Sequence, residues 1–342
     1  DDITTEAIAR AFDLPLERDN DTLAYLQEIF KKFKWTWTEN NAKQALFPKG
    51  AQVIPNPVGT AAGFALSVQN KLVLVMPGVP SETKRMLPEG VIPILKKTFP
   101  QPVPFAQQQT IKIFGLGESA IDEKLSSYDF SAIDVSVGFY PVFPENHLVL
   151  IARASSLEQT RQNLQKAVDA VSDQLGEWIF SYGEQTLEEM LAGFLTQKKL
   201  TLAVAESCTG GLIANRLTDV PGSSLFFEQG LVTYSNEAKI NLLGVPADII
   251  EKHGAVSEET ACSMAQEVRK LAGTDLGLSS TGIAGPSGGS LEKPVGTVYV
   301  ALADRTQTIC RHYRFRWDRK RNKLVTSEAA LMLLKNYLQE KK

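Results

Sequence analysis

The stretch from residue 200 to residue 211 reads Leu-Thr-Leu-Ala-Val-Ala-Glu-Ser-Cys-Thr-Gly-Gly. Its apolar run predicts a buried strand, and its two glycines predict a turn into a helix over residues 211–218. In such a turn Ser207 would lie beside unpaired helix N–H groups, which hold phosphates or oxyanions. A helix cap by Ser207 or Thr209 explains the same residues. The stretch indicates an α/β domain with a candidate site at a strand end.

Two further polar clusters follow predicted strands of the same domain. Residues 234–239 read Tyr-Ser-Asn-Glu-Ala-Lys, between a predicted strand (226–234) and a predicted helix (236–243). Residues 280–289 read Ser-Thr-Gly-Ile-Ala-Gly-Pro-Ser-Gly-Gly, after a predicted strand (275–281). Because open α/β sheets bind ligands beyond the carboxyl ends of their strands, we expect these clusters to meet at one edge.

These clusters contain the groups that general base catalysis needs. A partly desolvated Lys239 near a serine can act as the base, and Tyr234 can relay or donate the proton. A solvated lysine on a helix surface is the alternative. The glycine-rich loop exposes backbone amides to a ligand, or it is a flexible surface hairpin.

The segment from Arg311 to Lys323 holds seven Arg or Lys residues and one Asp. On a predicted strand over 308–316, apolar and cationic side chains alternate between the two faces. A nucleic-acid patch, a solvated face, or a single arginine that reaches a phosphate, such as Arg319, all fit this pattern.

The first half of the chain divides into two smaller units. Residues 1–104 contain a predicted helix over Glu6–Phe12, capped by Thr4 or Thr5, and another over Leu23–Lys34. They also contain a strand over Lys71–Met76, expected to be buried on both faces, and a helix over Ser81–Leu87 with Glu82 in its first turn. Residues 105–183 predict the order β-α-β-β-α-β. A proline-rich linker over 99–104 separates the two. We therefore predict three domains: 1–104, 105–183 and 184–342.

Composition narrows the function. The chain has 36 Lys and Arg against 39 Asp and Glu, a net charge of −3, which argues against nucleic acid or an anionic membrane as a general partner. Its apolar runs are too short to span a membrane. The three cysteines, Cys208, Cys262 and Cys310, form no disulfide framework or zinc motif, so we expect a reducing, cytoplasmic location. The three histidines fall in separate contexts and indicate no Ser-His-Asp triad.

Together these motifs resemble the bacterial competence/damage-inducible protein A (CinA) family. Residues 206–211, 234–239 and 281–286 are similar to the C-terminal domain of that family, in order and in spacing. Residues 56–61 and 76–82 resemble its N-terminal domain. The resemblance implies an α/β chain of three domains: a molybdopterin-binding-like domain whose start is missing, a small KH-type α+β domain, and a C-terminal amidohydrolase domain.

For the C-terminal domain, the resemblance implies hydrolysis of nicotinamide mononucleotide to nicotinic acid mononucleotide and ammonia, without a cofactor. Ser207 would be the nucleophile and Lys239 the base, with Tyr234 helping to pass the proton to the leaving ammonia. The implied substrate-binding residues are Thr209, Gly210, Gly211, Asn236, Thr281, Gly282, Gly285 and Arg319. Where the family has Gly-Asp-Arg, this chain has Trp317-Asp318-Arg319, which puts the turn geometry in question.

For the N-terminal domain, the resemblance implies an ADP-ribose pyrophosphatase that uses a divalent metal. Asp1, Asp2, Asn56 and Glu82 would form its site, with Asp2 and Glu82 on the metal. The family's glycine-rich loop precedes the Asp-Asp pair with which this chain begins, so we expect this chain not to catalyse that reaction. The expected partners are the two nucleotides and a second copy of the chain, as a homodimer.

Three alternatives remain. A serine acyl-enzyme of the penicillin-recognising kind is suggested by Tyr-Ser-Asn, but position 210 is Gly, so Ser-x-x-Lys is absent at Ser207. A non-catalytic role in DNA uptake or recombination would use the basic segment. In the third alternative, ADP-ribose hydrolysis is the main activity of the protein.

Overall fold

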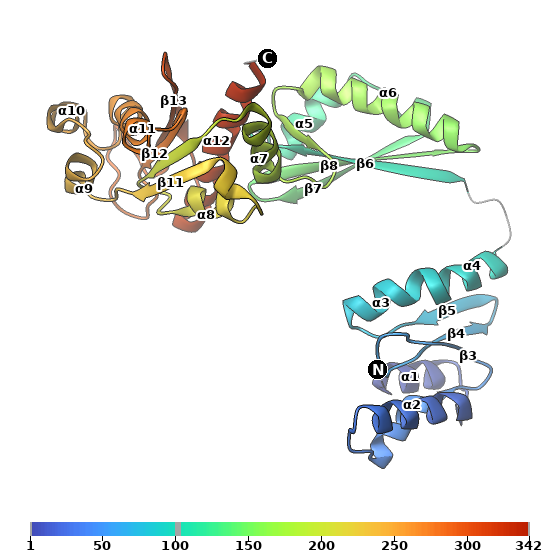
Figure 1. Ribbon diagram of the computed structural model, residues 1–342. Helices are drawn as coiled ribbons and strands as arrows, with labels where there is room; N and C mark the ends of the chain where they lie inside the picture. Colours follow the sequence, from blue (N-terminus) through green and yellow to red (C-terminus); the bar gives the residue numbers. More distant parts are fainter. Residues whose placement is uncertain (1, 100–103, 341–342) are drawn as a thin grey trace. The chain divides into compact units, whose positions relative to one another are not determined.

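The structure, a computed structural model, describes residues 2–99 and 104–340 (Figure 1). The chain divides into one unit up to Val103 and a second from Pro104 onward. Most of the predicted proline-rich linker, residues 100–103, lies outside the described residues.

The C-terminal domain is built on a five-stranded sheet in the order β11-β10-β12-β13-β14. Its strands are β10 (Leu202–Glu206), β11 (Phe227–Val232), β12 (Leu276–Gly282), β13 (Thr297–Ala303) and β14 (Thr308–Arg314). β10 runs parallel to β11 and β12, whereas β13 and β14 are antiparallel. The ends of β10, β11, β12 and β14 therefore lie at one edge with the start of β13, which is the edge where the sequence predicted the clusters.

Helices cover both faces of this sheet because its central strand is apolar on both sides. In β10, Leu202 and Val204 pack into one core cluster, and Ala203 and Ala205 into another. One face carries α7 (Leu187–Lys198), α8 (Leu212–Thr218) and α12 (Arg319–Glu340). The other carries α9 (Asn236–Asn241), α10 (Ala247–His253) and α11 (Glu258–Ala272). The domain is thus a three-layer α/β/α sandwich, in which α10 was not predicted.

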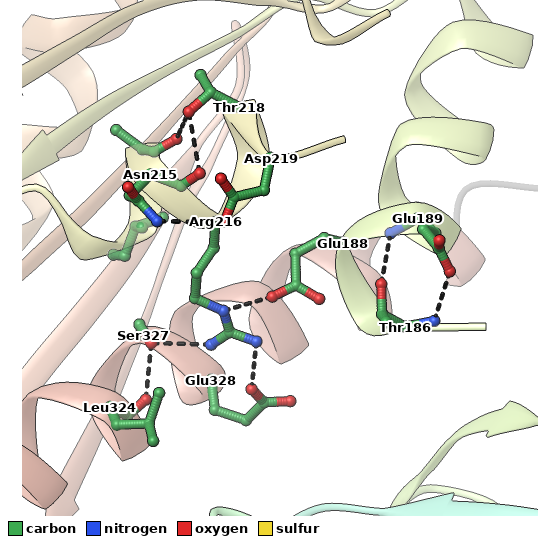
Figure 2. Close-up of polar contacts among 12 residues, drawn as sticks. Thr186, Glu188, Glu189, Asn215, Arg216, Thr218, Asp219, Leu324, Ser327 and Glu328 are labelled. Atoms are coloured by element: carbon green, nitrogen blue, oxygen red, sulfur yellow. Dashed lines mark hydrogen bonds and ion pairs between the residues drawn. The ribbon is translucent and has the colours of Figure 1, made fainter. Parts of the chain in front are cut away.

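A partly buried arginine joins the three helices of the first face (Figure 2). Arg216 on α8 forms ion pairs with Glu188 on α7 and Glu328 on α12, and it donates to Ser327 Oγ at 2.8 Å. Glu328 is fully buried, and burial raises its pKa to about 7 although Arg216 opposes the shift.

The middle domain has the predicted β-α-β-β-α-β order. Its elements are β6 (Phe105–Ile113), α5 (Glu118–Leu125), η3 (Phe130–Ile133), β7 (Val135–Val142), β8 (Glu145–Ala154), α6 (Leu157–Leu175) and β9 (Ile179–Tyr182). The antiparallel sheet has the order β7-β8-β6-β9. Phe114 and Phe180 pack into the same core cluster as α7 and α12. The buried Lys335 on α12 donates to the Ile179 carbonyl at 2.8 Å, so the two domains share one core.

The N-terminal unit holds two small antiparallel sheets, β1-β2 and β3-β4-β5. Its elements are α1 (Asp2–Ala11), β1 (Leu16–Arg18), α2 (Asn20–Lys32), η1 (Glu39–Ala45), β2 (Leu46–Pro48), β3 (Gln52–Ile54), β4 (Gly63–Val68), β5 (Lys71–Val75), α3 (Pro80–Met86), η2 (Leu87–Val91) and α4 (Ile92–Thr98).

Two predictions for this unit were wrong. Thr4 and Thr5 lie inside α1, so neither caps it. The strand expected to be buried on both faces, β5, is half-buried and within the described residues pairs with β4 alone, whereas β4 is the buried strand of this sheet. An apolar run does not show whether its strand lies at the edge or at the centre of a sheet, because burial of the strand depends on its neighbours.

None of the helices in the described parts of the chain combines the length and the apolar character that crossing a bilayer requires.

Candidate active site

Ser207 occupies a tight turn directly after β10. Its N–H donates to the Ser280 carbonyl at 3.0 Å, and its own carbonyl accepts from Gly210 N at 3.1 Å. Gly210 and Gly211 have φ values of +61° and +92°, which only glycine adopts without strain. The turn therefore holds Ser207 rigidly at the sheet edge, with 7% of its surface exposed.

Glu206 performs the capping role that the sequence allowed for Ser207 or Thr209. Its buried carboxylate accepts from the backbone N–H groups of Gly211, Ile213 and Ala214 at 3.0, 3.1 and 2.8 Å. A carboxylate at a helix N-terminus satisfies unpaired donors and the helix dipole together. The expectation that these helix amides hold a ligand is therefore wrong. The N–H groups of Cys208 and Thr209, in contrast, donate to no other residue among residues 2–99 and 104–340.

Lys239 reaches Ser207 from α9. Ser235 caps this helix by accepting from Ala238 N at 3.0 Å. The Nζ atom lies 3.0 Å from Ser207 Oγ and donates to the Thr233 and Tyr234 carbonyls at 2.9 and 3.3 Å. The side chain is 1% exposed, which excludes the solvated lysine that the sequence left open.

Burial lowers the pKa of Lys239. Within the described residues, no carboxylate forms an ion pair with Lys239 that would restore the charged form. The Thr233 and Tyr234 carbonyl oxygens can only accept, so each takes one N–H bond of Lys239 Nζ. The remaining position on Nζ points toward Ser207 Oγ, and there the lone pair of the neutral amine would accept the serine proton.

Cys208, the neighbour of Ser207, is not a competing nucleophile. Its side chain is buried, and burial raises the pKa of the thiol to about 12. The protonated thiol is a poor nucleophile. No histidine forms a hydrogen bond to Ser207 in the parts of the chain that the structure describes.

Tyr234 lies at the same edge but faces Arg319. Its ring is 56% exposed, and its hydroxyl accepts from Arg319 at 2.7 Å. Arg319 also donates to the Gly285 carbonyl at 2.8 Å. Over the described ranges, no hydrogen bond links the Tyr234 hydroxyl to Ser207 or Lys239.

The turn before Arg319 does not need the family's glycine. Trp317 does not adopt a positive φ. The buried Asn322 holds the turn, because its Nδ2 donates to the Ala284 and Trp317 carbonyls at 3.0 and 2.8 Å and its Oδ1 accepts from Trp317 N at 3.2 Å. The sequence reasoning missed Asn322, since its role depends on the approach of the glycine-rich loop to α12.

Four other predicted residues shape the edge. The Thr281 hydroxyl donates to the Ala255 carbonyl at 2.6 Å, and a Cβ on Gly282 would meet the Thr297 carbonyl oxygen at 2.8 Å. Thr209 shares a hydrogen bond of 2.7 Å with Ser280. Asn236 is exposed at the start of α9.

Lys323 is a cation near the nucleophile turn that the sequence did not single out. A Cβ placed on Gly210 would lie 3.4 Å from Lys323 Nζ. Lys323 is four residues after Arg319, so both lie on one face of α12. The spacing Arg-x-x-x-Lys at a helix start was the available signal.

The structure also brings together Asn56 and Glu82, two residues of the predicted N-terminal site. Asn56 is buried, and its Nδ2 donates to Glu82 Oε2 at 2.8 Å. Its Oδ1 accepts from the N–H groups of Val58 and Gly59. Asp1 and the side chain of Asp2 lie outside the described residues.

Comparison with known families assigns all three segments. Residues 184–338 match the family described as CinA C-terminal domain, residues 108–181 match the damage-inducible protein CinA KH domain, and residues 1–97 match a probable molybdopterin binding domain. A CinA-like protein of Syntrophus aciditrophicus is 54% identical over 339 residues, which are 99% of this chain and 81% of that relative. The chain belongs to the CinA family.

Other CinA proteins extend the likeness. A putative competence-damage inducible protein of Caldicellulosiruptor bescii is 42% identical over 98% of this chain and 81% of its own length. Among solved structures, the competence/damage inducible protein CihA of Agrobacterium tumefaciens is 38% identical, with a TM-score of 0.43, over 47% of this chain and 99% of its own. The competence damage-inducible protein A of Klebsiella pneumoniae is 34% identical, with a TM-score of 0.44, over 46% of this chain.

Proposed function

We propose that the C-terminal domain hydrolyses the carboxamide of nicotinamide mononucleotide to nicotinic acid mononucleotide and ammonia. The observation that carries the proposal is the buried pair of Ser207 Oγ and Lys239 Nζ, 3.0 Å apart at the carboxyl edge of the sheet. This distance lies within the reach that general base catalysis requires. The choice of substrate rests on the resemblance to the CinA family.

The reaction follows from the pair. Lys239, as the neutral amine, takes the hydroxyl proton while Ser207 Oγ forms a bond to the carboxamide carbon. The carbon–nitrogen bond of the tetrahedral intermediate then breaks, and the leaving nitrogen takes the proton and departs as ammonia. Water attacks the resulting ester through the same base, which releases the acid and returns the proton to Ser207.

Three further groups support this assignment. The N–H groups of Cys208 and Thr209 are the donors that we assign to the oxyanion. The Tyr234 hydroxyl accepts from Arg319, so its own O–H can still donate, and we assign it to passing the proton from Lys239 to the leaving nitrogen. Arg319 and Lys323 supply the positive charge that we assign to the phosphate.

The test is the steady-state rate of ammonia release from nicotinamide mononucleotide. Ser207→Ala is expected to lower kcat by at least about 10³-fold while substrate still binds, because the nucleophile acts only in the transition state. Ser224→Ala, an exposed serine just before β11 and so at the opposite edge, is the matched control and keeps wild-type kcat. Retention of more than about a tenth of kcat by Ser207→Ala would reduce Ser207 to a structural role.

For the N-terminal unit we propose metal-dependent ADP-ribose hydrolysis in chains that carry the family's glycine-rich loop. Glu82 would offer Oε1 to the metal, because Asn56 occupies Oε2. Over the described residues, no group of three His, Cys, Asp or Glu ligands surrounds Glu82, so these residues do not make a metal site by themselves. We therefore assign no step of that reaction to the present chain.

A further inference from the structure

A second cluster of reactive side chains lies away from the Ser207 edge, between α11 and β14. Glu258 and Cys262 are four residues apart on α11 and share one face of the helix. Cys310 lies on β14, which within the described residues pairs only with β13 and forms the edge of the sheet. One carboxylate oxygen and the two Sγ atoms all lie within 4.8 Å of one another.

The surrounding contacts fix this arrangement. One turn after Cys262, Gln266 Nε2 donates to Thr308 Oγ1 at 2.9 Å, and this contact aligns α11 with β14. Cys262 and Cys310 are half-buried and pack against a layer of small side chains that includes Ala261 and Ala301. The cluster is thus held by the sandwich and still open to a solvent ion.

We propose that Glu258, Cys262 and Cys310 form a binding site for a thiophilic divalent cation of the zinc type, which clamps the edge strand to α11. Ligands around tetrahedral zinc, with bonds of about 2.0–2.3 Å, lie roughly 3.3–3.8 Å apart, so the groups need to close by less than about 1.5 Å. On binding, two thiols release their protons to solvent and form two metal–sulfur bonds, and the carboxylate supplies the third ligand. Sequence spacing could not reveal the site, because Cys262 and Cys310 lie on different elements.

The test uses cobalt as a spectroscopic probe for the whole chain under reducing conditions. Addition of Co²⁺ to metal-free protein should produce a thiolate charge-transfer band in the near ultraviolet and tetrahedral d–d bands, saturating at one ion per chain. Zn²⁺ should displace Co²⁺ and so remove both the charge-transfer band and the d–d bands. It should also raise the Tm of the chain, because a ligand that binds only the folded state stabilises that state.

Variants separate this site from surface binding. Cys262→Ser, Cys310→Ser and Glu258→Gln should each weaken Zn²⁺ at least about tenfold. The matched control is Glu259→Gln, which removes the same charge from the neighbouring residue. The Glu259 carboxylate pairs with His253 at 3.1 Å, so this variant should leave the Zn²⁺ affinity unchanged. The proposal would be overturned if the cobalt bands persist in the Cys262→Ser/Cys310→Ser double variant. It would also be overturned if the bands are absent from a folded wild-type chain in which the Cys262 and Cys310 thiols are both free.

Discussion

Replacement of Lys239 by arginine isolates its role as a base from its role as a charge. The Nζ atom lies 3.0 Å from Ser207 Oγ, and two carbonyls hold it there. Guanidinium keeps the positive charge but cannot give up a proton in a protein. If Lys239 is the base, Lys239→Arg should be nearly as inactive as Lys239→Ala.

The size of the loss follows from the chemistry of the pair. Removal of a positioned general base typically costs about 10²–10⁴ in rate, which corresponds to about 3–5 kcal/mol of transition-state stabilisation. The assay is kcat for ammonia release from nicotinamide mononucleotide. Lys252→Arg, on the exposed face of α10, is the control and should keep wild-type kcat.

The pH profile gives a second measurement of the same role. Only the neutral amine accepts a proton, so kcat/KM should rise with pH through the pKa of Lys239 in the free enzyme. Because burial lowers this pKa, the rise should lie below the value of about 10.4 for an ordinary lysine. Substantial activity in Lys239→Arg would refute the reasoning and make lysine a charge for the phosphate or oxyanion, with Tyr234 as the better candidate for the base.

Two further results are expected. Glu206→Gln should lower the free energy of unfolding by about 1 kcal/mol in denaturant titration, because the cap of α8 loses its charge; an unchanged midpoint would contradict this role. Glu328 has its pKa raised to about 7 by burial, so its contribution to stability is full below its unfolded pKa and is lost as pH rises through 7. The stability should therefore fall by up to about 3 kcal/mol between pH 5 and 8, and Glu328→Gln should remove this dependence while Glu188→Gln keeps it; equal slopes in both variants would argue against Glu328.

The sequence predicted the edge of the C-terminal sheet well, for local reasons. The apolar run before Glu206 and the two glycines after Thr209 determine a strand and a turn without help from distant residues. The β-α-β-β-α-β order of the middle domain was predicted for the same reason.

What the sequence could not predict depends on tertiary contacts. Lys323 approaches Gly210 only because α12 packs beside α8. The contact of the Tyr234 hydroxyl with Arg319 was not predicted, because it depends on the start of α12 reaching the same edge. The three-residue strands β1, β2 and β3 are too short to show a period.

Ammonia release from nicotinamide mononucleotide by the purified wild-type chain tests the central claim most directly. The Ser207–Lys239 pair predicts ammonia and nicotinic acid mononucleotide in equal amounts, in the absence of any added metal. Failure of the folded chain to release ammonia above the Ser207→Ala background would contradict the proposed amidohydrolase activity.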